Sequence, residues 1–182
     1  MTKKTMNQKQ KHLLDAAGQI VQTQGPGRLT LAAVAKEANV SKGGLLHYFP
    51  NKNALIEGLI VQLIDAFEVS VTQKAASSDD PTAWLRAYIN TTFDPQLSQA
   101  EGSAGILAAV ANNPELLAPL YERYQQWQHQ IENSDIDPAL ATVLRLAADG
   151  LWFSELLGFG VLDEEKRAAT LQTLIRLLDE AQ

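Results

Sequence analysis

Apolar residues recur every three or four positions along this chain, and that spacing restricts its fold more than any other feature. The run of Leu13, Ala16, Ala17, Ile20 and Val21 shows it near the N-terminus, as expected for the buried face of an α-helix. Long runs that alternate apolar and polar residues, the pattern of a half-buried strand, do not occur in the sequence. The chain is therefore predicted to be all-α.

Helix starts are marked by a capping side chain followed by proline. The pairs Asp80-Pro81, Asn113-Pro114 and Asp137-Pro138 place an acceptor before a proline at the first helical position. Together with the periodicity, these signals predict about nine helices, at about 8–24, 31–38, 42–48, 52–75, 81–93, 101–112, 114–132, 138–158 and 163–181. The seam between an N-terminal head and a C-terminal body is expected within the long helix that starts near Lys52.

Charge divides the chain at the same place. The net charge of the whole chain is −6, but residues 1–52 hold eight Lys and Arg against two acidic residues, a net charge of +6. The remaining residues hold seven basic and 19 acidic side chains, a net charge of −12. A randomly uneven surface is the alternative, but the split coincides with the predicted seam. A basic head indicates that the head, rather than the whole chain, meets a polyanion.

The stretch from Asn39 to Lys52, NVSKGGLLHYFPNK, is typical of the second half of a helix-turn-helix. Thr30 is predicted to cap the helix before the turn, and Ser41 is predicted to cap the helix after it. Asn39 suits the turn, because asparagine tolerates the left-handed backbone conformation. Leu45 and Phe49 are the expected inward anchors of the second helix. This short helix, from Lys42 to Tyr48, is predicted to be a DNA recognition helix.

Two adjacent glycines, Gly43 and Gly44, lie near the start of that helix. A glycine inside a helix costs about 1 kcal/mol relative to alanine, so the pair needs a reason. Without side chains, the helix backbone can come close to phosphates or base edges. Lys42, His47 and Tyr48 then surround the glycines as hydrogen-bond donors. Neutral drift in a short surface helix is the alternative.

The segment TLAAVAKEANVSKGGLLHYFPNKNALI (30–56) resembles the DNA-binding signature of the TetR family of bacterial transcriptional regulators. The resemblance implies an all-helical homodimer, with a DNA-binding domain at 1–52 and an effector-binding and dimerisation domain at 53–182. By position, it implies operator contacts from Thr30, Ser41, Lys42, Gly43, Gly44, His47, Tyr48 and Lys52. Asn39 replaces the usual turn glycine. Gly44 and Leu46 replace a hydroxyl residue and a tyrosine often found there, so the operator sequence stays open.

The last two helices are expected to form the dimer interface. Apolar stripes on them give the candidate interface residues Leu144, Ala148, Leu151, Leu171, Leu174, Ile175 and Leu178. Two such helices from each subunit would make a four-helix interface. The alternative is that the stripes face the core of their own subunit, and only the family resemblance favours the dimer. A dimer predicts a palindromic operator.

The body is expected to hold an apolar pocket with a few polar groups. The candidate effector-binding residues are Phe67, Tyr88, Thr92, Leu107, Val110, Tyr121, Tyr124, Asp149, Trp152, Phe153 and Glu155. Asp149, Trp152 and Glu155 are spaced to share a helix face, and acidic and aromatic groups together would suit a lipophilic cation, as in regulators of multidrug efflux. The alternative is that the two acids are capping or surface charges.

The sequence thus predicts a one-component transcriptional regulator, most simply a repressor released from its operator by a small lipophilic effector. An activator of the same family, or a helical ligand-binding protein without operator binding, is the alternative. An enzyme is not expected, because the sequence lacks cysteine, a Gly-x-Ser-x-Gly motif and a phosphate-binding glycine loop. No cofactor or metal is expected. The absence of an N-terminal apolar segment and of cysteine favours the cytoplasm.

Overall fold

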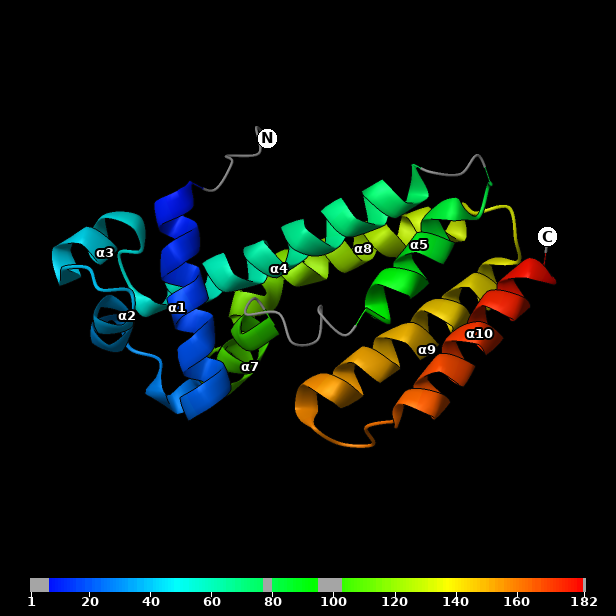
Figure 1. Ribbon diagram of the computed structural model, residues 1–182. Coiled ribbons are helices and arrows are strands. Elements are labelled where there is room, and N and C mark those ends of the chain that lie inside the picture. The colour runs from blue at the N-terminus through cyan, green and yellow to red at the C-terminus, as the bar shows by residue number, and fades with distance from the viewer. Residues whose placement is uncertain (1–6, 77–79, 95–102, 182) are drawn as a thin grey trace. The chain divides into compact units, whose positions relative to one another are not determined.

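The computed structural model describes residues 7–76, 80–94 and 103–181, and all regular structure in these ranges is helical (Figure 1). The α-helices are α1 Gln8–Gln24, α2 Leu31–Glu37, α3 Lys42–Tyr48, α4 Lys52–Ala75, α5 Ala83–Thr92, α7 Ser103–Asn112, α8 Ala118–Glu132, α9 Pro138–Leu157 and α10 Glu164–Asp179. Two 3-10 segments, η1 Pro26–Arg28 and η2 Pro114–Leu117, precede α2 and α8. The prediction of an all-α chain is confirmed. Lys3, Lys4 and the predicted helix start at 101–102 lie outside the described residues.

The last two α-helices begin at an aspartate cap. Oδ1 of Asp137 accepts hydrogen bonds from the backbone N–H groups of Ala139 and Leu140, at 2.6 and 3.3 Å, at the start of α9. Oδ1 of Asp163 accepts one from Lys166 N at 2.8 Å at the start of α10. These bonds satisfy donors that the first helical turn leaves unpaired.

The other two proline pairs start turns instead of α-helices. Asp80 accepts hydrogen bonds from the backbone and the hydroxyl of Thr82, at 2.7 and 2.9 Å, and α5 begins only at Ala83. Asn113 accepts from Glu115 N at 3.1 Å and starts η2, so that α8 begins four residues later than predicted. In both places a local side-chain-to-backbone bond competes with the α-helix.

The chain divides into two compact units, described separately here. Unit 1 comprises residues 1–64 and 100–121, and unit 2 comprises residues 65–99 and 122–182. Both α4 and α8 contain residues of each unit, so the seam expected within the long helix falls between Ile64 and Asp65. The functional division at 52/53 stays a prediction. In the described ranges, no helix is long and apolar enough to cross a membrane.

Unit 1 is held together by close approach of helices around α4. α1 packs against α2 and α7, and its residues Leu14 and Ile20 are fully buried. At Gly105 in α7, a Cβ atom would lie 2.6 Å from the Cβ of Leu59 and 3.0 Å from the backbone N of Ile60. α7 therefore lies against the backbone of α4, a contact that any side chain at this position would prevent.

The core of unit 2 lies between α5, α9 and α10, which contact one another (Figure 1). It consists of Leu85, Ile89, Phe93, Ile131, Ile136, Ala141, Leu144, Ala148, Leu151, Leu174 and Leu178. Leu171 and Ile175 are partly buried against it. All seven residues assigned to a dimer interface from the sequence thus belong to this core or its margin. This packing fits the alternative left open there, that the stripes face their own subunit, while Leu171 and Ile175 keep some exposed surface. The assignment of these residues to a dimer interface stays a prediction.

Candidate nucleic-acid interface and interior cluster

The turn between α2 and α3 depends on one left-handed residue. Asn39 has a φ of 52°, the one positive φ at a non-glycine residue in the described part of the chain. Asparagine adopts this conformation at low cost, which explains how it can stand in the turn. The turn is closed by a hydrogen bond from Val40 N to Ala35 O at 2.9 Å. From α1, Nε2 of His12 lies 3.0 Å from Ala38 O.

The α3 helix is fixed at both ends, as the sequence predicts. Oγ of Ser41 accepts a hydrogen bond from Gly44 N at 3.0 Å and caps the helix. Leu45 is fully buried, and Phe49 is buried just after the last turn. The ring of Phe49 packs over Gly58 of α4, where a Cβ would lie 2.9 Å from it. α3 is therefore held rigidly by its inward side, and its other side faces solvent.

No contact in the described part of the chain requires glycine at position 43. Gly43 and Gly44 are both exposed, and neither has a positive φ. A Cβ at Gly43 would meet only Ser41 Oγ, at 4.0 Å, and a Cβ at Gly44 would lie 3.3 Å from the same atom. Because the free protein has room for a side chain at Gly43, the simplest reason for the glycine is a binding partner whose close approach a side chain would block.

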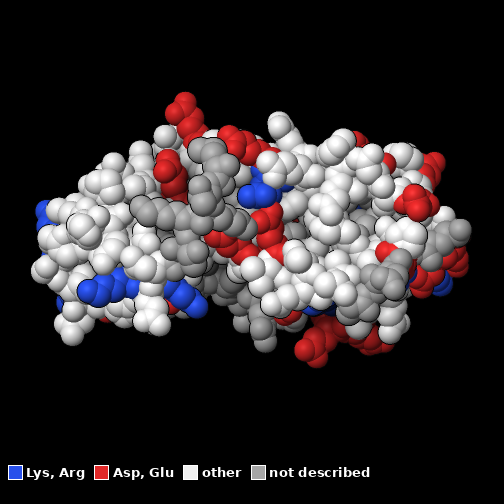
Figure 2. All heavy atoms as spheres, turned by 90° about the horizontal axis from the view of Figure 1, so that it is seen from above, with Lys and Arg blue, Asp and Glu red and all other residues white. Residues whose placement is uncertain are grey.

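Hydrogen-bond donors surround the glycines. Lys42 and His47 are exposed, and Tyr48 is half-buried with its ring 5.0 Å from that of His47. The caps Thr30 and Ser41 use their hydroxyl oxygens as acceptors, which leaves each O–H free to donate. Figure 2 shows most of the Lys and Arg side chains of the visible face at its α1–α3 end, together with some Asp and Glu, and mainly Asp and Glu over the rest of that face. An exposed set of donors on a basic head is suited to phosphate oxygens.

Unit 2 encloses a second candidate site, a cluster of aromatic rings. Phe67 lies in α4, Tyr88 in α5, and Tyr124 and Trp127 in α8. The ring of Trp127 lies 4.8 to 5.9 Å from the rings of the other three. Phe67 and Tyr88 pack edge to face at 5.0 Å. These four side chains form the interior cluster, an apolar environment in which any polar group must find a partner.

A buried ion pair adjoins the interior cluster. The carboxylate of Asp149 accepts a hydrogen bond from Tyr88 Oη at 2.7 Å and one from Arg145 Nη1 at 2.6 Å. The guanidinium of Arg145 lies 5.8 Å from the ring centre of Tyr124. Burial raises the pKa of Asp149, while the bonds from Tyr88 and Arg145 act in the opposite direction. Burial also raises the pKa of both tyrosines, so both hydroxyls stay protonated.

Glu155 is paired in the same way. Its carboxylate accepts from Arg167 Nε at 2.6 Å, and Arg167 also donates to the backbone oxygen of Phe93 at the end of α5. Neither Asp149 nor Glu155 is a surface or capping charge, and neither lacks a basic partner. The suggestion that both carboxylates face a lipophilic cation therefore has no support from their contacts.

The remaining residues predicted for the effector site lie in different places. In unit 2, Trp152 is buried, Phe153 is half-buried with its ring 4.8 Å from that of Trp152, and the buried hydroxyl of Thr92 donates to Tyr88 O at 2.9 Å. In unit 1, Leu107 is half-buried, while Val110 and Tyr121 are exposed.

Sequence reasoning did not select Trp127 or Arg145. The spacing of Arg145 four residues before Asp149 was the available signal.

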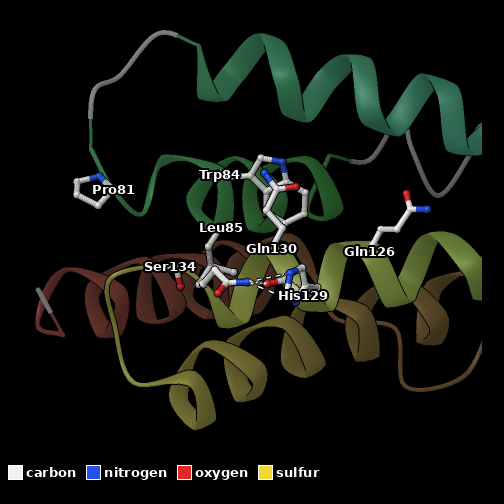
Figure 3. Close-up of a pocket in the computed structure, with 8 residues that line it drawn as sticks. Pro81, Trp84, Leu85, Gln126, His129, Gln130 and Ser134 are labelled. Atoms are coloured by element: carbon white, nitrogen blue, oxygen red, sulfur yellow. Dashed lines mark hydrogen bonds between the residues drawn. The ribbon is translucent and has the colours of Figure 1, made fainter.

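A hollow of about 500 Å³ lies next to the interior cluster in unit 2 (Figure 3), since its lining residue Trp84 has its ring 5.5 Å from that of Tyr88. It is lined from the start of α5 and the end of α8 by Pro81, Trp84, Leu85, Gln126, His129, Gln130, Asn133 and Ser134. Five of these side chains are exposed, so an occupant would stay largely solvated. Small-molecule sites in proteins usually bury most of their ligand. The exposed hollow therefore does not have the enclosure that is typical of an effector site.

Helices α2 and α3 form a helix-turn-helix on a helical body, the construction of a DNA-binding transcriptional regulator. Residues 13–59 match the family described as bacterial regulatory proteins of the tetR family, and residues 82–179 match the tetracyclin repressor-like C-terminal domain. The chain belongs to the TetR family, whose members regulate transcription and are not enzymes.

Relatives align along most of the chain. The HTH-type transcriptional regulator BetI of Burkholderia cenocepacia (strain HI2424) is 27% identical over 179 residues, covering 91% of each chain. A solved TetR-family regulator from Rhodococcus sp. superposes with a TM-score of 0.75 at 18% identity, over 96% of this chain and 99% of that one. The multidrug binding protein EbrR, solved with imidazole, has a TM-score of 0.67 at 22% identity, over 94% and 96%. These two structures share the fold.

Proposed function

We propose that this regulator is a repressor that binds a palindromic operator through α3. The observation that carries the proposal is the exposed pair Gly43 and Gly44, at the start of a helix that is otherwise anchored by Leu45 and Phe49. Glycine there weakens the helix without any benefit inside the chain, but it lets the backbone approach DNA. Thr30, Ser41, Lys42, His47, Tyr48 and Lys52 complete the proposed contact surface.

Each contact has its own role. The hydroxyls of Thr30 and Ser41 and the amines of Lys42 and Lys52 donate to phosphates, which fixes the helix on the duplex without reading sequence. His47 and Tyr48 lie further along α3 and supply base contacts. Because phosphate contacts release counterions, operator affinity falls steeply as salt rises.

A homodimer would place two α3 helices on one palindrome. A stripe of exposed apolar or small residues on α9 is suited to this interface: Val143, Leu146, Ala147, Gly150 and Leu157. Their spacing of three, one, three and seven residues keeps them on one side of the helix. Among the described residues, nothing outside the backbone of α9 itself lies within 4 Å of a Cβ at Gly150, so a second helix could approach closely there. This α9 stripe replaces the buried stripe selected from the sequence.

The effector site is proposed at the interior cluster, where a lipophilic molecule would be surrounded by aromatic rings. An effector releases the operator only if it binds the non-binding conformation more tightly than the binding one. A cationic, multidrug-type effector was the expectation from Asp149 and Glu155, and both carboxylates are already paired with arginines. We place the protein in the cytoplasm, where its operator is.

The test is binding of the purified protein to DNA upstream of its own gene, compared with random DNA across a salt series. Sequence-selective binding with a steep salt dependence, and a footprint with two-fold symmetry, is the expected result. Equal affinity for both DNAs at every salt concentration would contradict operator binding. A symmetric footprint also defines the fragment needed to test release by an effector.

A further inference from the structure

Two buried N–H groups on α9 have no acceptor. Nε of Arg145 and Nε1 of Trp152 are without a hydrogen-bond partner in the described part of the chain. Trp152 is 5% exposed, and the side chain of Arg145 is 14% exposed. A buried donor without an acceptor destabilises the folded state, so such groups are rare in folded proteins and call for an explanation.

Both donors lie on the side of α9 that carries Asp149. Positions 145, 149 and 152 are separated by four and three residues, which puts them on one face of a helix. Arg145 and Trp152 are about 10 Å apart along the axis, at about 1.5 Å per residue. Trp152 is expected to lean toward the turn that contains Asp149, because long side chains on a helix tilt toward its N-terminus.

Asp149, which lies between the two donors along α9, already has hydrogen-bond partners. Asp149 accepts from Arg145 Nη1 and from the hydroxyl of Tyr88, at 2.6 and 2.7 Å. A cationic ligand would have to displace Arg145 from a short ion pair in surroundings of low polarity, where such pairs are costly to break. A ligand with a hydrogen-bond acceptor would instead bond to the unpaired N–H groups of Arg145 and Trp152. Its bond to the guanidinium would be charge-assisted, and such bonds are stronger than bonds between neutral groups.

Two other buried polar atoms also lack partners, and both are acceptors. They are the amide oxygens of Gln62, which lies in unit 1, and Gln128. The Gln128 amide still donates to Glu132 and Thr142, each at 2.8 Å. Both unpaired donors of the described chain are thus on the Asp149 face of α9, and Arg145 lies over the ring of Tyr124 in the interior cluster.

We propose that the effector has an apolar body and presents carbonyl or carboxylate oxygens to Arg145 Nε and Trp152 Nε1. This inference rests on the proposed function, since it takes the interior cluster as the effector site. It changes the class of effector from a lipophilic cation to a lipophilic oxygen acceptor. A carboxylate bound near Asp149 would further favour the protonated form of that residue, so its binding would take up a proton.

Three probes with the same tail test the proposal: octanoate, octanamide and octyltrimethylammonium. Their affinities for the full-length protein are measured by calorimetry in the absence of DNA. We expect octanoate or octanamide to bind at least about tenfold more tightly than the ammonium probe, as one or two additional hydrogen bonds would produce. The comparison of octanoate with octanamide distinguishes a carboxylate from an uncharged carbonyl. Tightest binding of the ammonium probe, or binding of none of the three, would overturn the proposal.

Trp152→Phe keeps an aromatic ring and removes the N–H donor. It should weaken the preferred acceptor probe about three- to tenfold and leave the ammonium probe unchanged. The matched control is Trp84→Phe, which also keeps an aromatic ring and removes the indole N–H of a half-buried tryptophan, 5.5 Å from the ring of Tyr88 in the interior cluster (Figure 3). Equal losses in the two variants would contradict the role of Trp152. Because no DNA is present, failure of operator binding leaves this test intact, and operator binding without any acceptor preference refutes this inference alone.

Discussion

The side chain of Lys52, the first residue of α4, donates a 2.8 Å hydrogen bond to Oδ1 of Asn112, the last residue of α7. The amide of Asn112 is oriented by its own bond to Ala108 O at 2.7 Å. Lys52 is therefore positioned by a neutral acceptor, which a phosphate can replace. Lys52→Met should weaken binding to specific and random DNA alike and reduce the slope of log affinity against log salt by about one.

Two further variants give this prediction its controls. Asn112→Asp would turn the hydrogen bond into an ion pair that competes with phosphate, so it should weaken DNA binding only while Lys52 is present. His47→Ala should instead change the preference among operator sequences, because base contacts carry specificity. Fluorescence anisotropy with specific and random DNA over a salt series measures all three. If Lys52→Met and His47→Ala affect both DNAs equally, the assigned roles are wrong.

Gly43→Ala should change folding and DNA binding in opposite directions. The free protein has room for the methyl group, and alanine favours a helix over glycine by up to about 1 kcal/mol. The same methyl group would lie between the backbone of α3 and the DNA, so operator affinity should fall. Urea unfolding and operator titration provide the two readouts, with exposed Gln73→Ala of α4 as a control that leaves affinity unchanged. Unaltered operator affinity in Gly43→Ala would favour neutral drift as the origin of the glycine.

Gly105→Ala should destabilise the protein, although alanine is the better helix former. Its Cβ would lie 2.6 Å from Leu59 Cβ, and backbone atoms of α4 are the next nearest, so the helices must separate. Overpacking of this kind costs about 1–3 kcal/mol. Thermal or urea unfolding measures the loss, with Gly43→Ala as the matched change at an open position. Equal stability of the two variants would show that α7 shifts without penalty.

Tyr88→Phe should destabilise the protein by about 1–3 kcal/mol near neutral pH, because the carboxylate of Asp149 loses a buried hydrogen bond. The loss also raises the pKa of Asp149 further, since the Tyr88 bond is one of the interactions that lower it. A carboxyl group whose pKa is higher in the folded state than in the unfolded state stabilises the protein at pH values below its unfolded-state pKa. This contribution to stability is lost as pH rises through its folded-state pKa. The difference from wild type should therefore shrink on acidification toward about pH 4.

Urea unfolding of both proteins at several pH values measures this difference. Tyr121→Phe is the control, because the side chain of Tyr121 is exposed and loss of its hydroxyl should change stability by less than about 0.5 kcal/mol. A difference for Tyr88→Phe that stays constant with pH would mean that the hydroxyl acts through packing and not through the Asp149 charge.

Leu146→Glu should dissociate the homodimer without unfolding the chain. The side chain of Leu146 is 54% exposed in the α9 stripe, so a charge there harms an interface and not the core. Val69→Glu is the matched control, since Val69 is 53% exposed in α4. Sedimentation velocity reports the oligomeric state, and a dimeric Leu146→Glu protein would exclude this stripe from the interface.

The head was readily predicted from sequence because its structure is locally determined. Thr30 and Ser41 cap α2 and α3 through bonds that span three residues, and Asn39 adopts the left-handed turn that its side chain permits. Such features depend on neighbours along the chain. The late starts of α5 and α8 show the limit of this reasoning, since Asp80 and Asn113 bond to nearby backbone groups in turns as readily as in helix caps.

The body was less predictable because its features depend on distant contacts. The spacing of Leu144, Ala148 and Leu151 indicates a buried face, but periodicity does not distinguish the chain's own core from a second copy. The charges of Asp149 and Glu155 were recognised, whereas their partners come from another helical turn and another helix. Arg167 lies 12 residues beyond Glu155, a separation with no sequence signature. The sequence therefore identifies the charged residues of this region but not the residues that pair with them.

Unit 1 contains α7 as well as the three helices of the head, because residues 100–121 pack with residues 1–64. A chimaera that joins residues 1–52 to the body of another regulator would therefore separate α1 from the α7 that covers it. Exchange of operator specificity between relatives by a single crossover would expose apolar surface on both halves. If α3 reads the operator as proposed, point changes on α3 would alter DNA-binding specificity without exposing this apolar surface.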